Sequence, residues 1–213
     1  MKKNISFLFL IILFAACKEN KTTESKELSV VEKIAHAHGF EKWDAVNEIQ
    51  FKFGENRFWE WKPKTDDIKL TTNTDTISYN RKSMNSTAKK IDRAFINDKF
   101  WLLIPFQLIW DTSATISESV EATAPVSKTT MNKITVTYPK KGGYTPGDAY
   151  DIFYDNNYFI KEWVYRKGNS HKPTVSNTFE NLQDFNGIKI ALDHKKNDGN
   201  PIAKLSKIKI TYN

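Results

Sequence analysis

The feature that most constrains this fold is a dense apolar run at residues 100–110, FWLLIPFQLIW, which is closed by Asp111. A membrane-spanning helix needs about 20 apolar residues, so this run is too short to cross a bilayer. Pro105 stands in its middle, and proline interrupts both long helices and central strands. The run must therefore be buried against other apolar surface, and most of that surface lies on predicted β-strands.

The N-terminus has the pattern of a secretion signal. Lys2 and Lys3 form a basic start, residues 5–14 form an apolar stretch, and two alanines precede Cys17. Cys17 is the single cysteine of the chain, so it cannot form an internal disulfide. We therefore expect residues 1–16 to be a signal peptide and everything after Cys17 to lie outside the cytoplasm.

Residues 14–17, FAAC, resemble the lipobox of bacterial lipoproteins, with Phe14 where leucine is commonest. The resemblance implies that Cys17 carries a diacylglycerol and an acylated amino group. Several acyl chains give firm anchoring, because each buried CH₂ contributes about 0.8 kcal/mol. The expected location is the cell envelope, with the outer membrane favoured, and Lys18-Glu19 leaves open which membrane face is used. The alternatives are an uncleaved helix and an ordinary signal peptide with a chance cysteine.

The charge balance does not favour nucleic acid as a partner. Of 32 basic residues, Lys2 and Lys3 leave with the signal, so 30 remain against 25 acidic ones, a net charge of +5. This modest excess is spread along the chain and is typical of a solvated surface near anionic headgroups. Export makes nucleic acid a poor partner in any case.

Residues 17–27 are polar and predict a flexible tether, and residues 28–213 predict a single folded domain. Apolar residues at helical spacing predict a helix over 28–38 that ends at Gly39. Helical spacing also leads from residue 88 into the apolar run. Residues 112–130, rich in Ser, Thr, Ala and Glu, predict a mobile loop.

Most other segments alternate apolar and polar residues, as half-buried strands do. Strands are predicted at 49–53, 57–61, 68–70, 76–79, 134–138, 150–154, 158–165, 188–192 and 208–212. Short turns join many of them, which favours an antiparallel arrangement. The predicted fold is α+β but mainly β, a strongly curved antiparallel sheet with helices packed in or across its concave face.

Signatures of catalysis and metal binding are weak, and we predict neither an enzyme nor a cofactor. His36 and His38 are two apart on a predicted helix and would not share a face. Asp148 and Asp151 are three apart on a predicted strand and would point to opposite faces, so a turn-capping Asp148 and a solvent-facing Asp151 are favoured over a calcium site or an acid/base pair. A hydrolase would need a carboxylate cluster that no pattern singles out.

Four stretches carry a resemblance over about residues 28–210: HGFEKW (38–43), FINDKFWLLIPF (95–106), GGYTPGDAYD (142–151) and IKEWVYR (160–166). They resemble a family of bacterial lipoproteins that has no established activity. That family is similar in layout to the lipoprotein-localisation carriers LolA and LolB, whose fold is an open half-barrel with helices in its mouth. The resemblance implies a role in handling lipid or lipoprotein. The carriers of this kind that are soluble lack an anchor, so Cys17 fits a stationary component better than a shuttle.

Aromatic residues make up 13% of the chain, and a curved sheet leaves an apolar hollow that helices or a ligand must fill. A filled core and a true ligand cavity stay open as alternatives. The predicted function is binding of an acyl chain or other hydrophobic ligand, and the alternative is a surface module for glycans or proteins. The candidate lining residues are Phe51, Phe53, Trp59, Trp61, Trp101, Phe106, Trp110, Trp163 and Tyr165.

Overall fold

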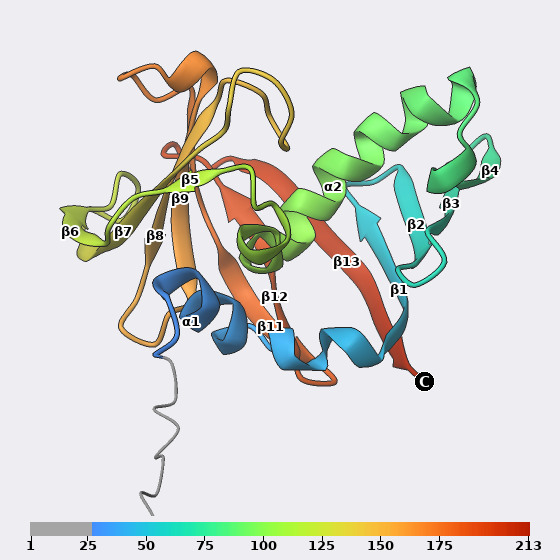
Figure 1. The fold of residues 1–213 in the computed structure, drawn as a ribbon, viewed down its shortest axis with the longest axis horizontal. Coiled ribbons are helices and arrows are strands. Elements are labelled where there is room, and N and C mark those ends of the chain that lie inside the picture. The colour runs from blue at the N-terminus through green and yellow to red at the C-terminus, as the bar shows by residue number, and fades with distance from the viewer. Residues whose placement is uncertain (1–26) are drawn as a thin grey trace, which may run out of the picture.

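The computed structural model describes residues 27–213, so the signal peptide, Cys17 and nearly all of the tether lie outside the described residues. The described chain forms two antiparallel β-sheets and two α-helices, together with three short 3₁₀ helices labelled η (Figure 1). The predicted mainly β fold with antiparallel strands and few helices is confirmed. Neither sheet is closed or strongly curled, so the half-barrel stays a prediction.

In chain order the elements are α1 (Val30–Ala37), η1 (Phe40–Ala45), β1 (Val46–Phe53), β2 (Arg57–Lys62), β3 (Asp67–Thr71), β4 (Thr76–Asn80), η2 (Arg81–Ser83), α2 (Ser86–Trp110), β5 (Thr115–Ile116), β6 (Val120–Thr123), β7 (Thr130–Thr137), β8 (Ala149–Tyr154), β9 (Ile160–Arg166), η3 (Lys167–Asn169), β10 (Val175–Thr178), β11 (Glu180–Phe185), β12 (Ile188–Lys195) and β13 (Pro201–Tyr212).

The two sheets divide the strands into a seven-stranded and a six-stranded group. The first has the order β11-β12-β13-β1-β2-β3-β4, and the second has the order β10-β9-β8-β7-β5, with β6 also paired to β7. Hairpins join β1 to β4 in sequence order, as the alternating pattern predicts. The C-terminal strand β13 closes back on β1, with Ile210 opposite Ile49. An isolated bridge between Asn177 of β10 and Lys196, directly after β12, links the two sheets.

Helix α2 is interrupted by a kink within the apolar run, as the position of Pro105 led us to expect. Asn85 caps it, accepting a hydrogen bond of 2.8 Å from the backbone N–H of Ala88. Leu103 has non-helical angles (φ −132°, ψ 36°), so two helical segments meet at a kink there, two residues before Pro105. A bend at proline is the expected response, because the ring clashes with the preceding turn. In Figure 1 the last turns of α2 are seen end-on, at an angle to the long first part.

Two different faces of α2 pack against the two sheets. Phe95, Leu102, Leu103 and Phe106 belong to a core cluster with the seven-stranded sheet. Phe100, Ile104 and Leu108, at i, i+4 and i+8, belong to a second cluster with the six-stranded sheet. The apolar run is therefore shared between two cores, and α2 separates them.

The N-terminal helix α1 begins with a capping box. Ser29 caps the backbone N–H of Glu32, and the Glu32 carboxylate accepts a bond of 2.7 Å from the Ser29 N–H. Gly39 ends α1 as predicted, with φ 91°, and a Cβ there would clash with the carbonyl oxygen of Gly187. The backbone N–H of Lys189 donates to the carbonyl of His38 at 3.0 Å. These contacts attach α1 to the start of β12.

The segment predicted as a mobile loop, residues 112–130, contains the two short strands β5 and β6. Ile116 pairs with Val136, and Val120 pairs with Lys133. Both strands therefore extend the edge of the six-stranded sheet beside β7. The backbone pairing differs from our expectation of a structureless loop, and the mobility of the segment stays a prediction.

Two further strands, β10 and β11, were not predicted. Four of the six residues of β11 are exposed, so its sequence shows no apolar alternation. Asn177, buried within β10, is polar and gives no strand signal. No helix in residues 27–213 has the length and apolar character needed to cross a membrane.

Candidate functional site

Helix α2 divides the nine predicted lining residues between the two cores. Phe51, Phe53, Trp59, Trp61, Phe106 and Trp110 lie on the side of the seven-stranded sheet, and Trp101, Trp163 and Tyr165 lie on the side of the six-stranded sheet. The structure therefore brings the nine side chains into two groups instead of one hollow.

The group beside the seven-stranded sheet is densely packed. Phe51 and Trp59 have no exposed surface, and Phe95 of α2 lies edge-on to both Trp59 and Trp61 with ring centroids 5.4 Å apart in each case. The ring centroids of Trp110 and Trp43 lie 4.7 Å apart, so the Trp110 ring packs against Trp43. The geometry is that of an ordinary core, and a ligand role for these residues stays a prediction.

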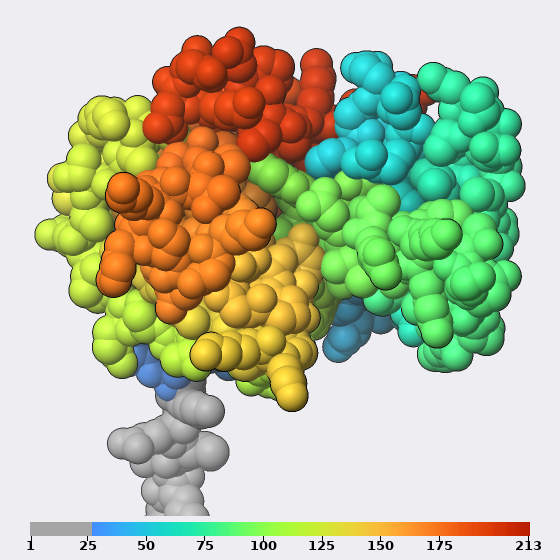
Figure 2. Space-filling model, turned by 90° about the horizontal axis from the view of Figure 1, so that it is seen from above, coloured from blue at the N-terminus to red at the C-terminus, as the bar shows by residue number. Residues whose placement is uncertain are grey.

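The group beside the six-stranded sheet borders a pocket of about 250 Å³, which we call the aromatic pocket. It lies where α2 meets β8, β9, β10, the loop before β8 and the start of β13. In Figure 2 these segments, coloured green, orange, yellow and red, surround a hollow in the face shown. Its lining residues are Asn97, Phe100, Trp101, Tyr144, Thr145, Tyr150, Trp163, Tyr165, Val175 and Ile202.

Stacked rings fix the wall of the aromatic pocket. Phe100 and Tyr144 stack with centroids 3.8 Å apart and planes within 6°. The ring centroids of Trp101 and Trp163 lie 4.4 Å apart, and those of Tyr150 and Trp163 lie 5.3 Å apart. Such contacts add about 0.5–1.5 kcal/mol per pair beyond area burial, so the wall is preorganised.

Sequence reasoning found Trp101, Trp163 and Tyr165 but missed the rest of this lining. Tyr144 and Thr145 belong to the loop GGYTPG, which drew attention only as a turn and as part of a resemblance. Val175 and Ile202 lie on strands of different sheets. Their meeting depends on the contact between sheet edges, which residue spacing does not reveal.

The tyrosine hydroxyls of the aromatic pocket are held neutral. Burial raises the pKa of Tyr144 and of Tyr150 well above the usual value. Burial and then the hydrogen bond to Asp148, 2.8 Å long, raise the pKa of Tyr165 to about 12. The pocket therefore presents apolar rings and uncharged hydroxyls at its lining.

The carboxylates near the pocket each have a structural partner. Asp148 accepts from Tyr165 and from the backbone N–H of Gly168 at 2.7 Å, so it ties two loops together. Asp151, expected to face solvent, is instead 16% exposed and lies 3.0 Å from the Arg166 guanidinium. Thr135 donates to Asp151 at 2.7 Å, so this carboxylate is part of the sheet.

The histidines singled out in the sequence also have structural surroundings. His38 is buried at the end of α1 with Nδ1 2.8 Å from the carbonyl of Ile34, and burial lowers its pKa to about 4. His36 is exposed on the same helix. Within the described part of the chain, no group of three or more His, Cys, Asp or Glu side chains is placed to hold a metal ion.

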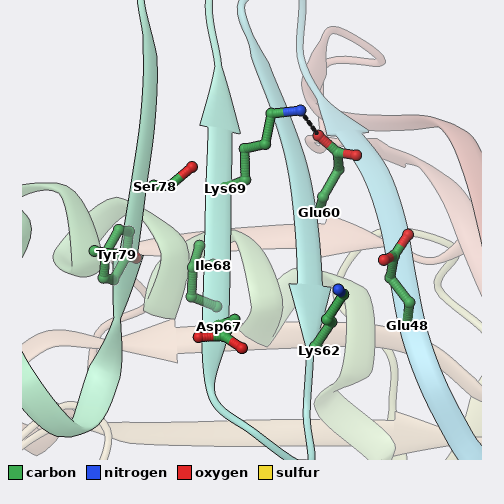
Figure 3. A pocket seen from close by; sticks show the side chains of 8 residues that line it. All are labelled: Glu48, Glu60, Lys62, Asp67, Ile68, Lys69, Ser78 and Tyr79. Atoms are coloured by element: carbon green, nitrogen blue, oxygen red, sulfur yellow. Dashed lines mark ion pairs between the residues drawn. The ribbon is translucent and has the colours of Figure 1, made fainter.

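A larger groove, about 420 Å³, lies over the outer face of β1 to β4 (Figure 3). Its side chains carry both signs of charge, and Lys69 pairs with Glu60 at 2.8 Å. Charged side chains of mixed sign across an exposed sheet are typical of a solvated surface. We therefore favour the smaller aromatic pocket as the candidate site.

Comparisons with protein families and with curated proteins find no match. Among solved structures, the chain is similar to a DUF1329 family protein from Desulfovibrio piger, with 11% sequence identity and a TM-score of 0.45. The similarity covers 85% of this chain and 91% of that one. This likeness is too distant to carry a functional argument.

Proposed function

We propose that the protein is a lipoprotein anchored in the bacterial cell envelope, and that its folded domain binds an acyl chain or another hydrophobic ligand in the aromatic pocket. The observation that carries the proposal is the hollow beside Trp101, Trp163 and Tyr165, bounded by apolar rings on α2 and β9. Ligand sites are typically concave and mostly apolar with a few fixed polar groups, and this pocket has that character.

The volume of the pocket bears on how a ligand would sit. Sites for whole drug-sized ligands measure about 300–1,000 Å³. At about 250 Å³ and open to the surface, the aromatic pocket suits one ring or one segment of a chain. We therefore propose partial burial, with the remainder of the ligand outside.

The proposal extends to the arrangement of the two sheets. They meet at the bridge between Asn177 and Lys196, and α2 lies between their apolar faces. We propose that the two sheets together correspond to an open half-barrel with α2 across its hollow. In that arrangement α2 fills most of the hollow, and the aromatic pocket is the part that stays open.

The anchor would place this pocket near a membrane. Residues 17–27 can span at most about 35 Å when fully extended. A domain held at Cys17 by such a tether would remain close to lipid headgroups. A stationary acceptor or holder of a hydrophobic molecule is therefore the role that we propose.

The test uses the exported chain with Cys17→Ser, which removes the acylation site. We expect native mass spectrometry to detect a bound lipid, and added palmitate or lysophospholipid to raise the melting temperature. Val175→Trp should fill the pocket and abolish both effects. Val120→Trp, at a residue that is 50% exposed and away from the pocket lining, is the matched control. If Val175→Trp binds like the control, the proposed site is wrong.

A glycan-binding module is the second candidate, and one observation favours it. Trp101 and Tyr165 are only half-buried, and the pocket also exposes polar groups of Thr145 and Asn97. Aromatic faces beside hydroxyl and amide groups suit a sugar ring. A glycan array without hits, together with a bound lipid, would reject this candidate.

A further inference from the structure

Behind the aromatic pocket, four rings form a closed cycle of contacts that we call the ring quartet. The ring centroids lie 4.4 Å apart for Trp101 and Trp163 and 5.3 Å apart for Trp163 and Phe179. They lie 4.6 Å apart for Phe179 and His194 and 5.0 Å apart for His194 and Trp101. These residues come from α2, β9, the connection after β10, and β12. The ring quartet therefore sits where the two sheets meet.

Polar atoms in and beside the ring quartet lack hydrogen-bond partners among residues 27–213. They are Nε1 of Trp163, Oδ1 of Asn177 and Nε2 of His194. Asn177 lies directly opposite Trp163 in the pairing of β10 with β9. All three side chains are nearly or fully buried, with exposed fractions of 3%, 0% and 0%. Folded proteins rarely leave such atoms unpaired, because each costs about 1–3 kcal/mol.

The hydrogen-bonding roles of these atoms follow from their neighbours. Nδ1 of His194 lies 3.0 Å from the carbonyl of Thr178, so it carries the proton and leaves Nε2 as an acceptor. The Asn177 amide nitrogen donates to the carbonyl of Thr178 at 3.0 Å, which leaves Oδ1 as a second acceptor. The indole N–H of Trp163 is a donor. The set thus offers one donor and two acceptors.

A neutral hydroxyl-bearing group matches this set better than an ion does. A hydroxyl both donates and accepts, whereas a carboxylate would face two acceptors. Burial lowers the pKa of His194 to about 4, so the imidazole is neutral.

Trp101 stands between this set and the aromatic pocket, on the weakest turn of α2. Its ring contacts both Trp163 and His194, and it also lines the pocket. Pro105 has no N–H, so the carbonyl of Trp101 cannot receive its usual i+4 hydrogen bond. Leu103, two residues on, has already left helical geometry. The backbone at Trp101 is therefore the part of α2 that can adjust most easily.

We propose that Trp101 closes an inner recess of the aromatic pocket, and that this recess recognises hydroxyl groups of a neutral ring such as a pyranose sugar. The proposal rests on the proposed function in one respect, since both require the aromatic pocket to take a ligand. A purely apolar ligand would leave the three atoms behind Trp101 without hydrogen bonds, whereas a ligand with hydroxyl groups could pair with them. The ligand would stack its apolar face on the tryptophan rings and direct hydroxyls inward.

The test compares two ring compounds of similar size on the exported Cys17→Ser chain. Methyl β-glucoside has the hydroxyls and methoxycyclohexane lacks them. We expect the glucoside to bind more tightly, with contacts to tryptophan protons visible by saturation-transfer NMR. Trp163→Phe keeps the ring but removes the donor, and should weaken glucoside binding about 3- to 10-fold with little effect on methoxycyclohexane.

The matched control is Trp61→Phe, because Nε1 of Trp61 is also buried without a partner in the described structure, but in the other core. This control should bind both compounds like the parent chain.

Two binding results would overturn the inference: equal affinity of the parent chain for the two compounds, or an unchanged glucoside affinity in Trp163→Phe. A structure with the glucoside present in which ordered water alone satisfies the three atoms would also overturn it. Binding of methoxycyclohexane and palmitate in that case would leave the proposed function standing. Glucoside binding without any lipid binding would reject the proposed function and keep the inference.

Discussion

The two sides of α2 differ in the hydrogen bonding of the buried polar groups beside them. On the side of the seven-stranded sheet, the buried carboxylate of Asp98 accepts from Arg57 at 2.6 Å and from the Trp59 indole at 2.8 Å. Asp92 likewise accepts from Arg81 at 2.9 Å and from the Tyr79 hydroxyl at 3.0 Å. On the side of the six-stranded sheet, the ring quartet leaves polar atoms unpaired next to a hollow.

This difference separates stability from binding within one helix. Satisfied buried polar groups and filled volume are what a core requires, while unpaired groups beside a hollow are a cost that a binding site can recover from its ligand. One exception stands on the packed side, the unpaired indole of Trp61. The comparison nevertheless shows a filled core on one face of α2 and, on the other, the hollow to which we propose a binding role.

The largest expected effect is the loss of a ring from the packed side. Phe95→Ala should reduce the free energy of unfolding by about 4 kcal/mol, because a fully buried phenylalanine leaves a cavity among Trp59 and Trp61. Trp101→Ala should cost about half as much, because the half-buried Trp101 already borders a hollow. Urea unfolding measures both values. Equal losses would mean that the two sides are packed alike.

An intermediate effect is expected from the buried ion pair. Asp98→Ala should cost about 3 kcal/mol, because it leaves the Trp59 indole and part of the Arg57 guanidinium without an acceptor. Asp148→Ala, on the pocket side, removes bonds to the partly exposed Tyr165 and Gly168 and should cost about 1 kcal/mol. Thermal unfolding in parallel provides the measurement. A larger loss for Asp148→Ala would reverse the assignment of roles.

A separate expected effect is a dependence of the free energy of unfolding on pH. Burial holds the pKa of His194 at about 4, below its unfolded value of about 6.5, so the unfolded chain binds more protons between these values. The free energy of unfolding is therefore highest above pH 6.5 and decreases as the pH drops toward 4. His194 alone lowers it by about 2 kcal/mol at pH 5. His38 should add a similar slope.

Replacing each histidine separately would sharpen the comparison. His194→Phe should remove one part of the pH slope in urea unfolding, and His38→Phe should remove the other. A bound glucoside should oppose protonation of His194 but leave the contribution of His38 unchanged. If the slope in His194→Phe equals that of the parent chain, His194 does not titrate in the way that its burial implies.

The sequence predicted best where one strand faces one core. Alternation at Ile49, Phe51 and Phe53, for example, placed β1 and its hairpin partners correctly. It failed for β11, whose exposed polar residues form an edge strand with no apolar pattern. Pro105 correctly indicated an interruption of the long helix, which is kinked at Leu103, but the sequence did not reveal that α2 packs against both cores.

The candidate site was only partly visible for a similar reason. Trp101, Trp163 and Tyr165 stood out as large rings, but the residues that define their surroundings come from remote parts of the chain. Asn177 lies beside the site at the bridge between the sheets, His194 reaches it through its contact with Trp101, and Tyr144 joins it through a glycine-rich loop. Polar residues on unremarkable strands carry no signal of this kind until the tertiary contacts are known.

The attachment of α1 to β12 also constrains when the domain can fold. The Lys189 ammonium and the carbonyl of Ala37 lie 3.4 Å apart although 152 residues separate them, and Gly39 packs on the backbone of Gly187. At synthesis rates of about 5–20 residues per second, the docking surface for α1 appears roughly 8–30 s after α1 itself. Helix α1 therefore lacks its docking partner throughout this interval. The maturation at Cys17 that we propose would then precede completion of the fold.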